Sequence, residues 1–131
     1  MPSALIEVRR SLSQQAETDI MDAVHRALVG AFKIPVGDRC VRLIAHEPHR
    51  FACPPDRDHP ELYTHISLDV FAGRSLDAKR ALYRAIVENL EPLGIPRDHV
   101  KVVVRESPRE NWGVSGGRAG SGVDLGFEVE V

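Results

Sequence analysis

The sequence predicts an α+β fold in which duplicated β-α-β units form one four-stranded sheet with both helices on the same face. Three observations support this prediction. Each half of the chain contains a β-rich segment, an amphipathic helical segment, an Ile-Pro pair and a second β-rich segment, in that order. The two halves keep a nearly constant spacing, and 131 residues are too few for two separate cores. Matching positions lie 60 to 64 residues apart: Arg10 and Arg74, Ile34 and Ile95, and Asp38 and Asp98.

The first unit covers about residues 2–46. It begins with a short apolar strand, and its helix is expected to extend to about Phe32. Ser11 and Gln14 have the form of a capping box, which predicts where this helix begins. The helix must end before Pro35, because proline cannot continue the hydrogen-bond ladder. The expected core face of the helix is formed by Ile20, Met21, Val24, Leu28 and Phe32.

The second unit covers about residues 63–105 and repeats this order. Its first strand, residues 63–70, alternates polar and apolar side chains, so one face is apolar and the other is wet or functional. Ser75 is the expected N-cap of a helix that extends to about Leu90. Because both helices lie on one face of the sheet, the other face stays uncovered. We expect this face to be apolar and to be covered in a closed symmetric oligomer.

Two segments lie outside the predicted repeat. Residues 47–62 form a proline-rich loop that joins the two units on the surface. Residues 106–131 form a glycine-rich tail that contains Trp112 and is expected to end in a short strand at 126–131. Loops this rich in glycine often wrap a neighbour or border a site. The whole chain, residues 1–131, is therefore predicted to be a single domain.

Composition argues against several classes of partner. The chain has 17 basic and 19 acidic residues and a net charge of -2, so it offers no excess of positive charge to nucleic acid. No apolar run approaches the roughly 18 residues that span a membrane, and the start of the chain lacks a signal-peptide pattern. Cys40 and Cys53 are expected to be free thiols in a cytoplasmic protein.

Several side chains near the proline-rich loop have the chemistry of metal ligands, but their spacing matches no standard pattern. A solvated surface loop explains them better, so no metal and no cofactor are expected. These side chains are His46, His49, Cys53 and His59.

The second residue of the chain has its own chemistry. Met1 precedes Pro2, and a small second residue allows the initiator methionine to be removed, which leaves a secondary amine at the N-terminus. Such an amine can act as an acid or a base near neutral pH, or attack a carbonyl group. The other interpretation is that Met-Pro is an ordinary start, and that the chain is a binding or assembly module that keeps its methionine.

Several short segments along the chain form a further pattern. In chain order they are Pro2, residues 22–28, Ala31-Phe32, Ile34-Pro35, Gly37-Asp38-Arg39, Gly73-Arg74-Ser75, Trp112 and Gly116-Gly117-Arg118. Together with the duplicated unit, they resemble the tautomerase superfamily, most closely its malonate semialdehyde decarboxylase branch. In that family the amino-terminal proline is catalytic. The resemblance implies that Pro2 is the catalytic group, that Asp38 activates water or polarises the carbonyl, and that Arg74 binds the substrate carboxylate. It also implies a homotrimer.

The sequence departs from the family pattern where substrates bind. The decarboxylase branch carries a second arginine two residues before the position of Arg74, and this chain has Ala72 there. The related cis-3-chloroacrylic acid dehalogenase has an arginine three residues before the position of Arg74, where this chain has Phe71. The strand tyrosine of that dehalogenase is also absent from residues 102–104. A single guanidinium holds a carboxylate less rigidly than a pair, so the substrate stays open.

Other candidate site residues each have two interpretations. Arg10 either lines the pocket as the repeat partner of the carboxylate-binding arginine or lies in solvent. His25 either contacts substrate or is a packed, hydrogen-bonded helix residue. Trp112 either forms a wall of the pocket or fills a subunit interface. Asp38 is either catalytic or a turn residue, as Asp98 is in the second unit.

The expected protein is a cytoplasmic homotrimeric enzyme that acts on a small oxo acid. In keto-enol tautomerisation, a neutral Pro2 moves a proton between oxygen and carbon while Arg74 anchors the carboxylate. In decarboxylation of a 3-oxo acid of the malonate semialdehyde type, a cationic Pro2 polarises the carbonyl. A carboxylate as close as that of Asp38 would favour the cation.

Overall fold

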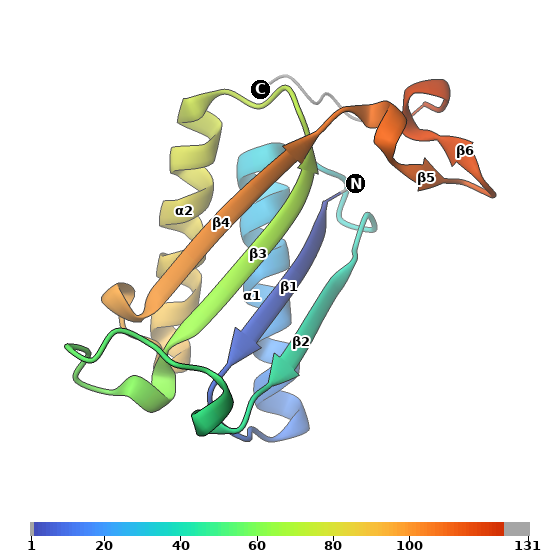
Figure 1. The fold of residues 1–131 in the computed structure, drawn as a ribbon. Coiled ribbons are helices and arrows are strands. Elements are labelled where there is room, and N and C mark those ends of the chain that lie inside the picture. Colours follow the sequence, from blue (N-terminus) through green and yellow to red (C-terminus); the bar gives the residue numbers. More distant parts are fainter. Residues whose placement is uncertain (1, 125–131) are drawn as a thin grey trace.

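The computed structural model describes residues 2–124, which form a mixed four-stranded sheet with two helices on one face (Figure 1). The strands lie in the order β2-β1-β3-β4; β1 pairs in parallel with β2, β3 in parallel with β4, and β1 antiparallel to β3. The predicted fold class is confirmed. The strand expected at 126–131 lies outside the described residues. The strands are β1 (Ser3–Val8), β2 (Val41–Ala45), β3 (Thr64–Phe71) and β4 (Val100–Ser107).

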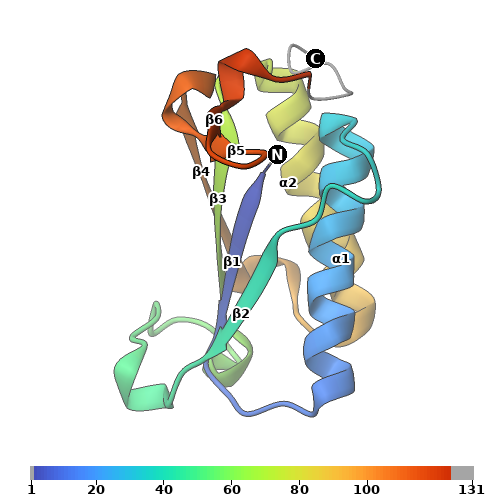
Figure 2. The ribbon, with the colours of Figure 1, turned by 90° about the vertical axis from the view of Figure 1, so that its right-hand side faces the viewer.

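The two helices, α1 (Gln14–Phe32) and α2 (Leu76–Leu90), lie side by side on the same face of the sheet (Figure 2). Each helix begins after a serine whose hydroxyl accepts the backbone N–H three residues later, at 3.1 Å. The N-cap predicted at Ser75 is confirmed, whereas the capping box predicted at Ser11 is wrong. Ser13 caps α1, because it is the residue directly before the first helical turn and so reaches the free N–H groups. No helix within residues 2–124 is long and apolar enough to cross a membrane.

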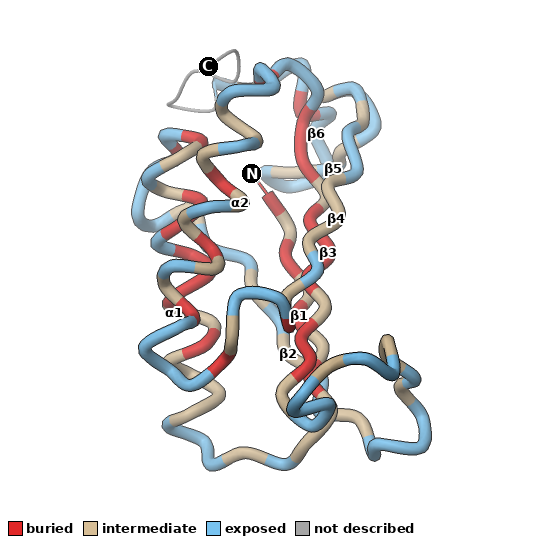
Figure 3. The backbone as a smooth tube through the Cα atoms, turned by 90° about the vertical axis from the view of Figure 1, so that its left-hand side faces the viewer, coloured by how far each residue is buried: buried red, intermediate tan, exposed pale blue. Residues whose placement is uncertain are grey.

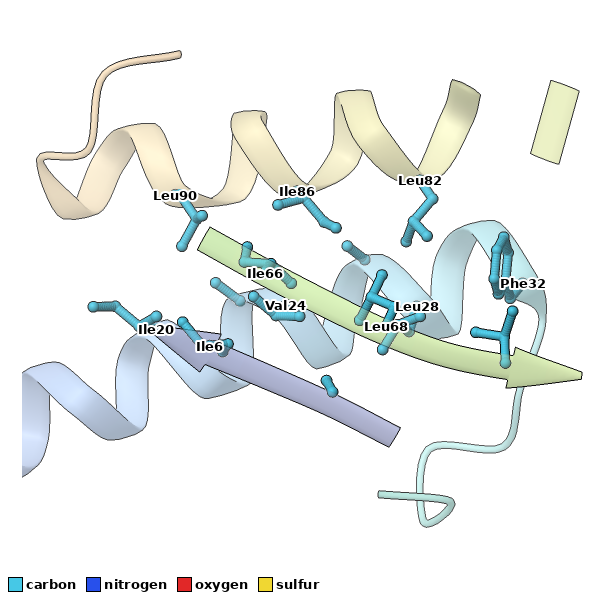
Figure 4. Packing of buried hydrophobic residues seen from close by; sticks show 14 of the residues in the cluster. Ile6, Ile20, Val24, Leu28, Phe32, Ile66, Leu68, Leu82, Ile86 and Leu90 are labelled. Carbon is cyan, nitrogen blue, oxygen red and sulfur yellow. The ribbon is translucent and has the colours of Figure 1, made fainter. Parts of the chain in front are cut away.

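The core lies between the sheet and the two helices, where the buried segments of both layers face one another (Figure 3). Every second residue of β1 and β3 points into it, and each helix contributes one apolar stripe (Figure 4). None of the central side chains is more than 2% exposed, so these residues hold the layers together. They are Ala4, Ile6 and Val8 of β1, Ile66, Leu68 and Val70 of β3, Ile20, Val24 and Leu28 of α1, and Leu82, Ile86 and Leu90 of α2.

The uncovered face of the sheet is mixed rather than apolar, so that expectation is wrong. Strand residues alternate between the two faces, and the positions between the core residues are mostly charged or polar. The side chain of Arg105 donates to both carboxylate oxygens of Asp69, at 2.9 and 3.3 Å, across β3 and β4. Other residues of this face are Leu5, Glu7, Arg42, Ile44, His65, Lys101 and Val103.

The same short turn follows β2 and β4. After β2, a 3-10 helix at Pro48–Arg50 precedes Phe51; after β4, a 3-10 helix at Arg109–Asn111 precedes Trp112. In both turns the aromatic residue donates its backbone N–H to the carbonyl three residues before it, at 3.3 and 3.2 Å. The repeat therefore continues into the loop and the tail that the sequence analysis placed outside it. In the tail, the hairpin of β5 (Gly113–Val114) and β6 (Arg118–Ala119) projects from the body (Figure 1).

Candidate active site

Pro2 is buried at the start of β1, in the middle of the sheet. On one side, Ser3 pairs with Asp69 near the end of β3. On the other side, the backbone N–H of Ala4 donates to the carbonyl of Cys40 just before β2, at 3.0 Å. Continued by one residue, these registers place Pro2 between the end of β3 and the segment that leads into β2. Pro2 thus lies between a segment of the first unit and a segment of the second unit.

Arg74 follows β3 and is buried, with 5% of its surface exposed. Its Nη1 donates to the carbonyl of Phe71 at 3.2 Å, and its guanidinium carbon lies 4.7 Å from the centre of the Phe32 ring. Burial lowers the pKa of Arg74, and the negative charges of Glu106 and Asp38 oppose this shift. An arginine remains charged in such surroundings, so this end of the sheet holds a buried cation that favours an anionic ligand.

Asp38 lies in the turn between α1 and β2, where its backbone N–H donates to the carbonyl of Pro35 at 3.0 Å. The residue is half-buried, and its Oδ2 atom is buried. His25 of α1, only 3% exposed, holds this turn because its Nε2 donates to the carbonyl of Val36 at 2.7 Å. A carbonyl can only accept, so the Nε2 atom carries a proton. His25 is therefore a packed, hydrogen-bonded residue that fixes the turn carrying Asp38.

Trp112 packs against the last residue of β3, three residues before the buried arginine. Its ring meets that of Phe71 edge-on, with 4.9 Å between the ring centres, and its Nε1 donates to Ser107 Oγ at 2.8 Å. Gly120 donates its N–H to the carbonyl of Trp112 at 2.8 Å. A Cβ at position 120 would lie 2.6 Å from the carbonyl oxygen of Arg109, so the turn requires glycine there. Trp112 is thus held at the same end of the sheet as the start of β1.

Arg10 lies at the opposite end of the sheet. β1 runs from Ser3 to Val8, and Arg10 follows its far end, directly after Arg9, which donates to the carbonyls of the proline-rich loop. Figure 1 shows that this end of β1 lies opposite the N-terminal end. A strand of six residues spans about 20 Å. Within one protomer, the fold therefore gathers four of the predicted site residues at one end and leaves Arg10 at the other. The four are Pro2, Asp38, Arg74 and Trp112.

The sequence analysis missed the aromatic support of the buried arginine. Phe32 was predicted only as a core residue of α1, yet its ring lies under the Arg74 guanidinium. Nothing in the local sequence indicates this contact, because it joins the end of one helix to the loop before the other.

The histidines in and near the proline-rich loop do not form a metal site with other ligands: no group of three or more potential metal ligands occurs within residues 2–124. His46 instead donates to Glu7 at 2.9 Å.

Comparisons with known proteins point to one family. A family model described as tautomerase enzyme matches residues 38–115. A probable tautomerase of Ralstonia nicotianae is 36% identical over 52 residues, which are 39% of this chain and 74% of that protein.

Two solved structures show the same fold. FG41 malonate semialdehyde decarboxylase inhibited by 3-bromopropiolate has a TM-score of 0.77 and 29% identity, and the match covers 89% of this chain and 92% of that one. A fused 4-OT described as an asymmetric trimer has a TM-score of 0.80 and 18% identity, over 91% of this chain and 96% of that one.

Replacing His25→Phe should loosen the turn that carries Asp38, because the phenyl ring keeps the bulk of the imidazole but cannot donate to Val36. We expect the free energy of unfolding, measured in urea, to fall by about 1 kcal/mol. Amide hydrogen exchange at Asp38 should become faster, because its partner carbonyl lies in the same turn. The exposed His49→Phe should change neither quantity. Unchanged exchange at Asp38 in His25→Phe would show that the histidine does not hold the turn.

Proposed function

Because the chain belongs to the tautomerase family, we propose that it is an enzyme in which Pro2, freed by removal of Met1, moves protons on a small oxo acid. The observation that carries this proposal is the meeting of a buried proline, a buried arginine and an aspartate at one end of the sheet. Proton transfer needs a titratable group next to a site that orients the substrate, and these three side chains supply both.

Keto-enol tautomerisation is the reaction that we propose first. The neutral amine of Pro2 takes the hydroxyl proton of the enol, and the carbonyl double bond forms as the carbon–carbon double bond breaks. The electron pair of that bond then accepts a proton from the Pro2 ammonium at the neighbouring carbon, which restores the neutral amine. Arg74 binds the substrate carboxylate, and the ring of Phe32 beneath its guanidinium keeps that group in place.

Decarboxylation of a 3-oxo acid is the second candidate, because the chain is 29% identical to a malonate semialdehyde decarboxylase. Here Pro2 acts as a cation that donates a hydrogen bond to the 3-oxo group. The bond to the carboxylate carbon breaks and carbon dioxide leaves; the electrons of that bond form the carbon–carbon double bond of an enol while the 3-oxo oxygen takes the proton of Pro2. The enol then isomerises to the carbonyl product, and Pro2 regains its proton from solvent. A buried, apolar setting for Pro2 favours the neutral amine that tautomerisation needs, whereas a carboxylate close to it favours the cation that decarboxylation needs.

We further propose that the enzyme is a homotrimer in the cytoplasm. One sheet face is uncovered in the protomer, and the fused 4-OT of the same fold is described as a trimer. The interface would be partly polar, since charged side chains share that face with Leu5, Ile44 and Val103. Cys40 and Cys53 are free thiols, which a reducing compartment would preserve.

Sedimentation equilibrium should give a mass near three times the 14.5 kDa of one chain. Because the proposed interface includes charged side chains, the assembly should depend on salt concentration more than a purely apolar one. A stable monomer at micromolar concentration would contradict the proposed trimer.

Arg74→Gln should lower kcat/KM for an oxo acid carboxylate far more than Arg10→Gln. A hydrogen bond to a charged group contributes on the order of 1.5–3 kcal/mol, which corresponds to a loss of about 10- to 150-fold. No arginine at position 72 compensates for this loss, since Ala72 stands there. Arg10→Gln is the matched control at the far end of β1, and its activity should stay within about twofold of the unchanged protein. Equal losses in both variants would place the carboxylate site elsewhere.

A chain that retains Met1 should have no activity, because its proline nitrogen is an amide and cannot take a proton. The processed chain is prepared by ordinary expression and the unprocessed chain by expression with methionine aminopeptidase inhibited, and intact mass distinguishes the two. In the processed chain, tautomerisation of an arylpyruvate should rise with pH as Pro2 loses its proton. Decarboxylation of a 3-oxo acid should instead fall over the same titration. Equal turnover by both chains would exclude the proline mechanism.

A further inference from the structure

An ion pair next to Arg74 joins the first turn of α2 to the end of β4. Lys79 Nζ and Glu106 Oε1 form this pair, and their side chains are only 22% and 31% exposed. The backbone N–H of Lys79 donates to the carbonyl of Ser75 at 3.1 Å, so the lysine is fixed to the residue that directly follows Arg74. Because solvent screens a partly buried pair less than an exposed one, the two side chains hold each other in place.

Glu106 lies on the same side of the sheet as the guanidinium of Arg74. It pairs in register with Val70 of β3, whose side chain is buried in the core between the sheet and the helices. Paired residues of neighbouring strands point to the same face, so the carboxylate of Glu106 lies on the helix side. Arg74 reaches that side too, because its guanidinium lies over the ring of Phe32 at the end of α1. The ion pair therefore lies on the opposite face of the sheet from the proposed trimer interface.

The carboxylate of Glu106 acts on the charge of Arg74. Burial lowers the pKa of Arg74, and the negative charge of Glu106 opposes this shift more than that of Asp38 does. A carboxylate close to a guanidinium competes with the carboxylate of a ligand, because both accept from the same N–H groups. In the sequence of the loop between β3 and α2, Arg74 is the only basic residue, so no neighbour on that loop replaces it. Lys79 offers Glu106 a second cation and so reduces this competition.

We propose that Lys79 is a positioning residue of the carboxylate site: it holds Glu106 and so leaves the guanidinium of Arg74 to the substrate. This inference rests on the proposed function, in which Arg74 binds the substrate carboxylate. Without the lysine, the carboxylate of Glu106 turns to Arg74, and a substrate must displace it. Lys79 thus acts through these two residues and not on the substrate itself. The ion pair sets the affinity for an anion and leaves the proton-transfer step unchanged.

Titration calorimetry on the full-length, assembled protein tests the inference with 3-phenylpropanoate, an arylpyruvate analogue that lacks the oxo group and cannot be turned over. Lys79→Met should bind this carboxylate about tenfold more weakly, because Glu106 then competes for Arg74. Lys79→Met/Glu106→Gln should bind it within about twofold of the unchanged protein, because the competing carboxylate is gone. Glu106→Gln alone should bind it at least as tightly as the unchanged protein.

Kinetics with an arylpyruvate provide a second readout. In the processed chain, Lys79→Met should raise KM about tenfold and change kcat by less than about twofold, because only the binding of the carboxylate is affected. The matched control is Arg80→Met on the same helix, where the ion pair with Asp77 is exposed. This control should bind 3-phenylpropanoate like the unchanged protein, since an exposed ion pair contributes little.

Two results would overturn the inference: unchanged binding of 3-phenylpropanoate in Lys79→Met, or a loss that the added Glu106→Gln does not restore. Urea unfolding shows whether each variant is folded. If Lys79→Met does not fold, Glu106→Gln alone decides the question. Weaker binding in that variant contradicts a competing carboxylate, and equal or tighter binding supports one.

Arg74→Gln distinguishes a failure of this inference from a failure of the proposed function. If Arg74→Gln loses 3-phenylpropanoate but Lys79→Met keeps it, the carboxylate site stands and only the inference fails. If Arg74→Gln binds normally, the proposed carboxylate site fails and the inference fails with it. If the variants bind as expected but the processed chain turns over no oxo acid, the proline mechanism fails and the role of Lys79 stands.

Discussion

The antiparallel pairing of β1 with β3 joins the two β-α-β units, and the rest of the structure depends on it. Because the two strands run in opposite directions, the start of β1 lies beside the end of β3. The candidate active site is therefore assembled from both halves of the chain. Pro2 and Asp38 come from the first unit, and Arg74 and Trp112 from the second. Neither unit holds a complete site by itself.

The buried guanidinium of Arg74 sets the electrostatics of that site. Removing a charge from water is costly unless other groups replace the lost hydration. Here the face of the Phe32 ring and the carbonyl of Phe71 replace part of the hydration of the guanidinium. The negative charges of Asp38 and Glu106 stabilise its positive charge further. The result is a buried cation on the short loop between β3 and α2, which is suited to bind an anionic ligand.

The two ends of the sheet share a scaffold but differ in chemistry. The residue directly before the N-cap serine is Arg74 in the second unit and Leu12 in the first. The end that follows β1 therefore lacks a buried cation at this position, and its loop is held instead by Arg9. The two units thus have similar turns, and only the second carries a buried cation directly before its helix.

The order of the elements, the helix that Ser75 caps and the segments that carry Pro2, Asp38 and Arg74 could be predicted from the sequence, because periodicity, capping and turns are local properties. Which of these residues lie close together could not, because that depends on how distant segments pack. The length of β1 separates Arg10 from Pro2, and the chain folds back after α1 so that His25 holds the turn of Asp38. Which side chains share the mixed face depends on strand register. A shift of one residue exchanges the two faces of a strand, and register is set by contacts between residues distant in the sequence.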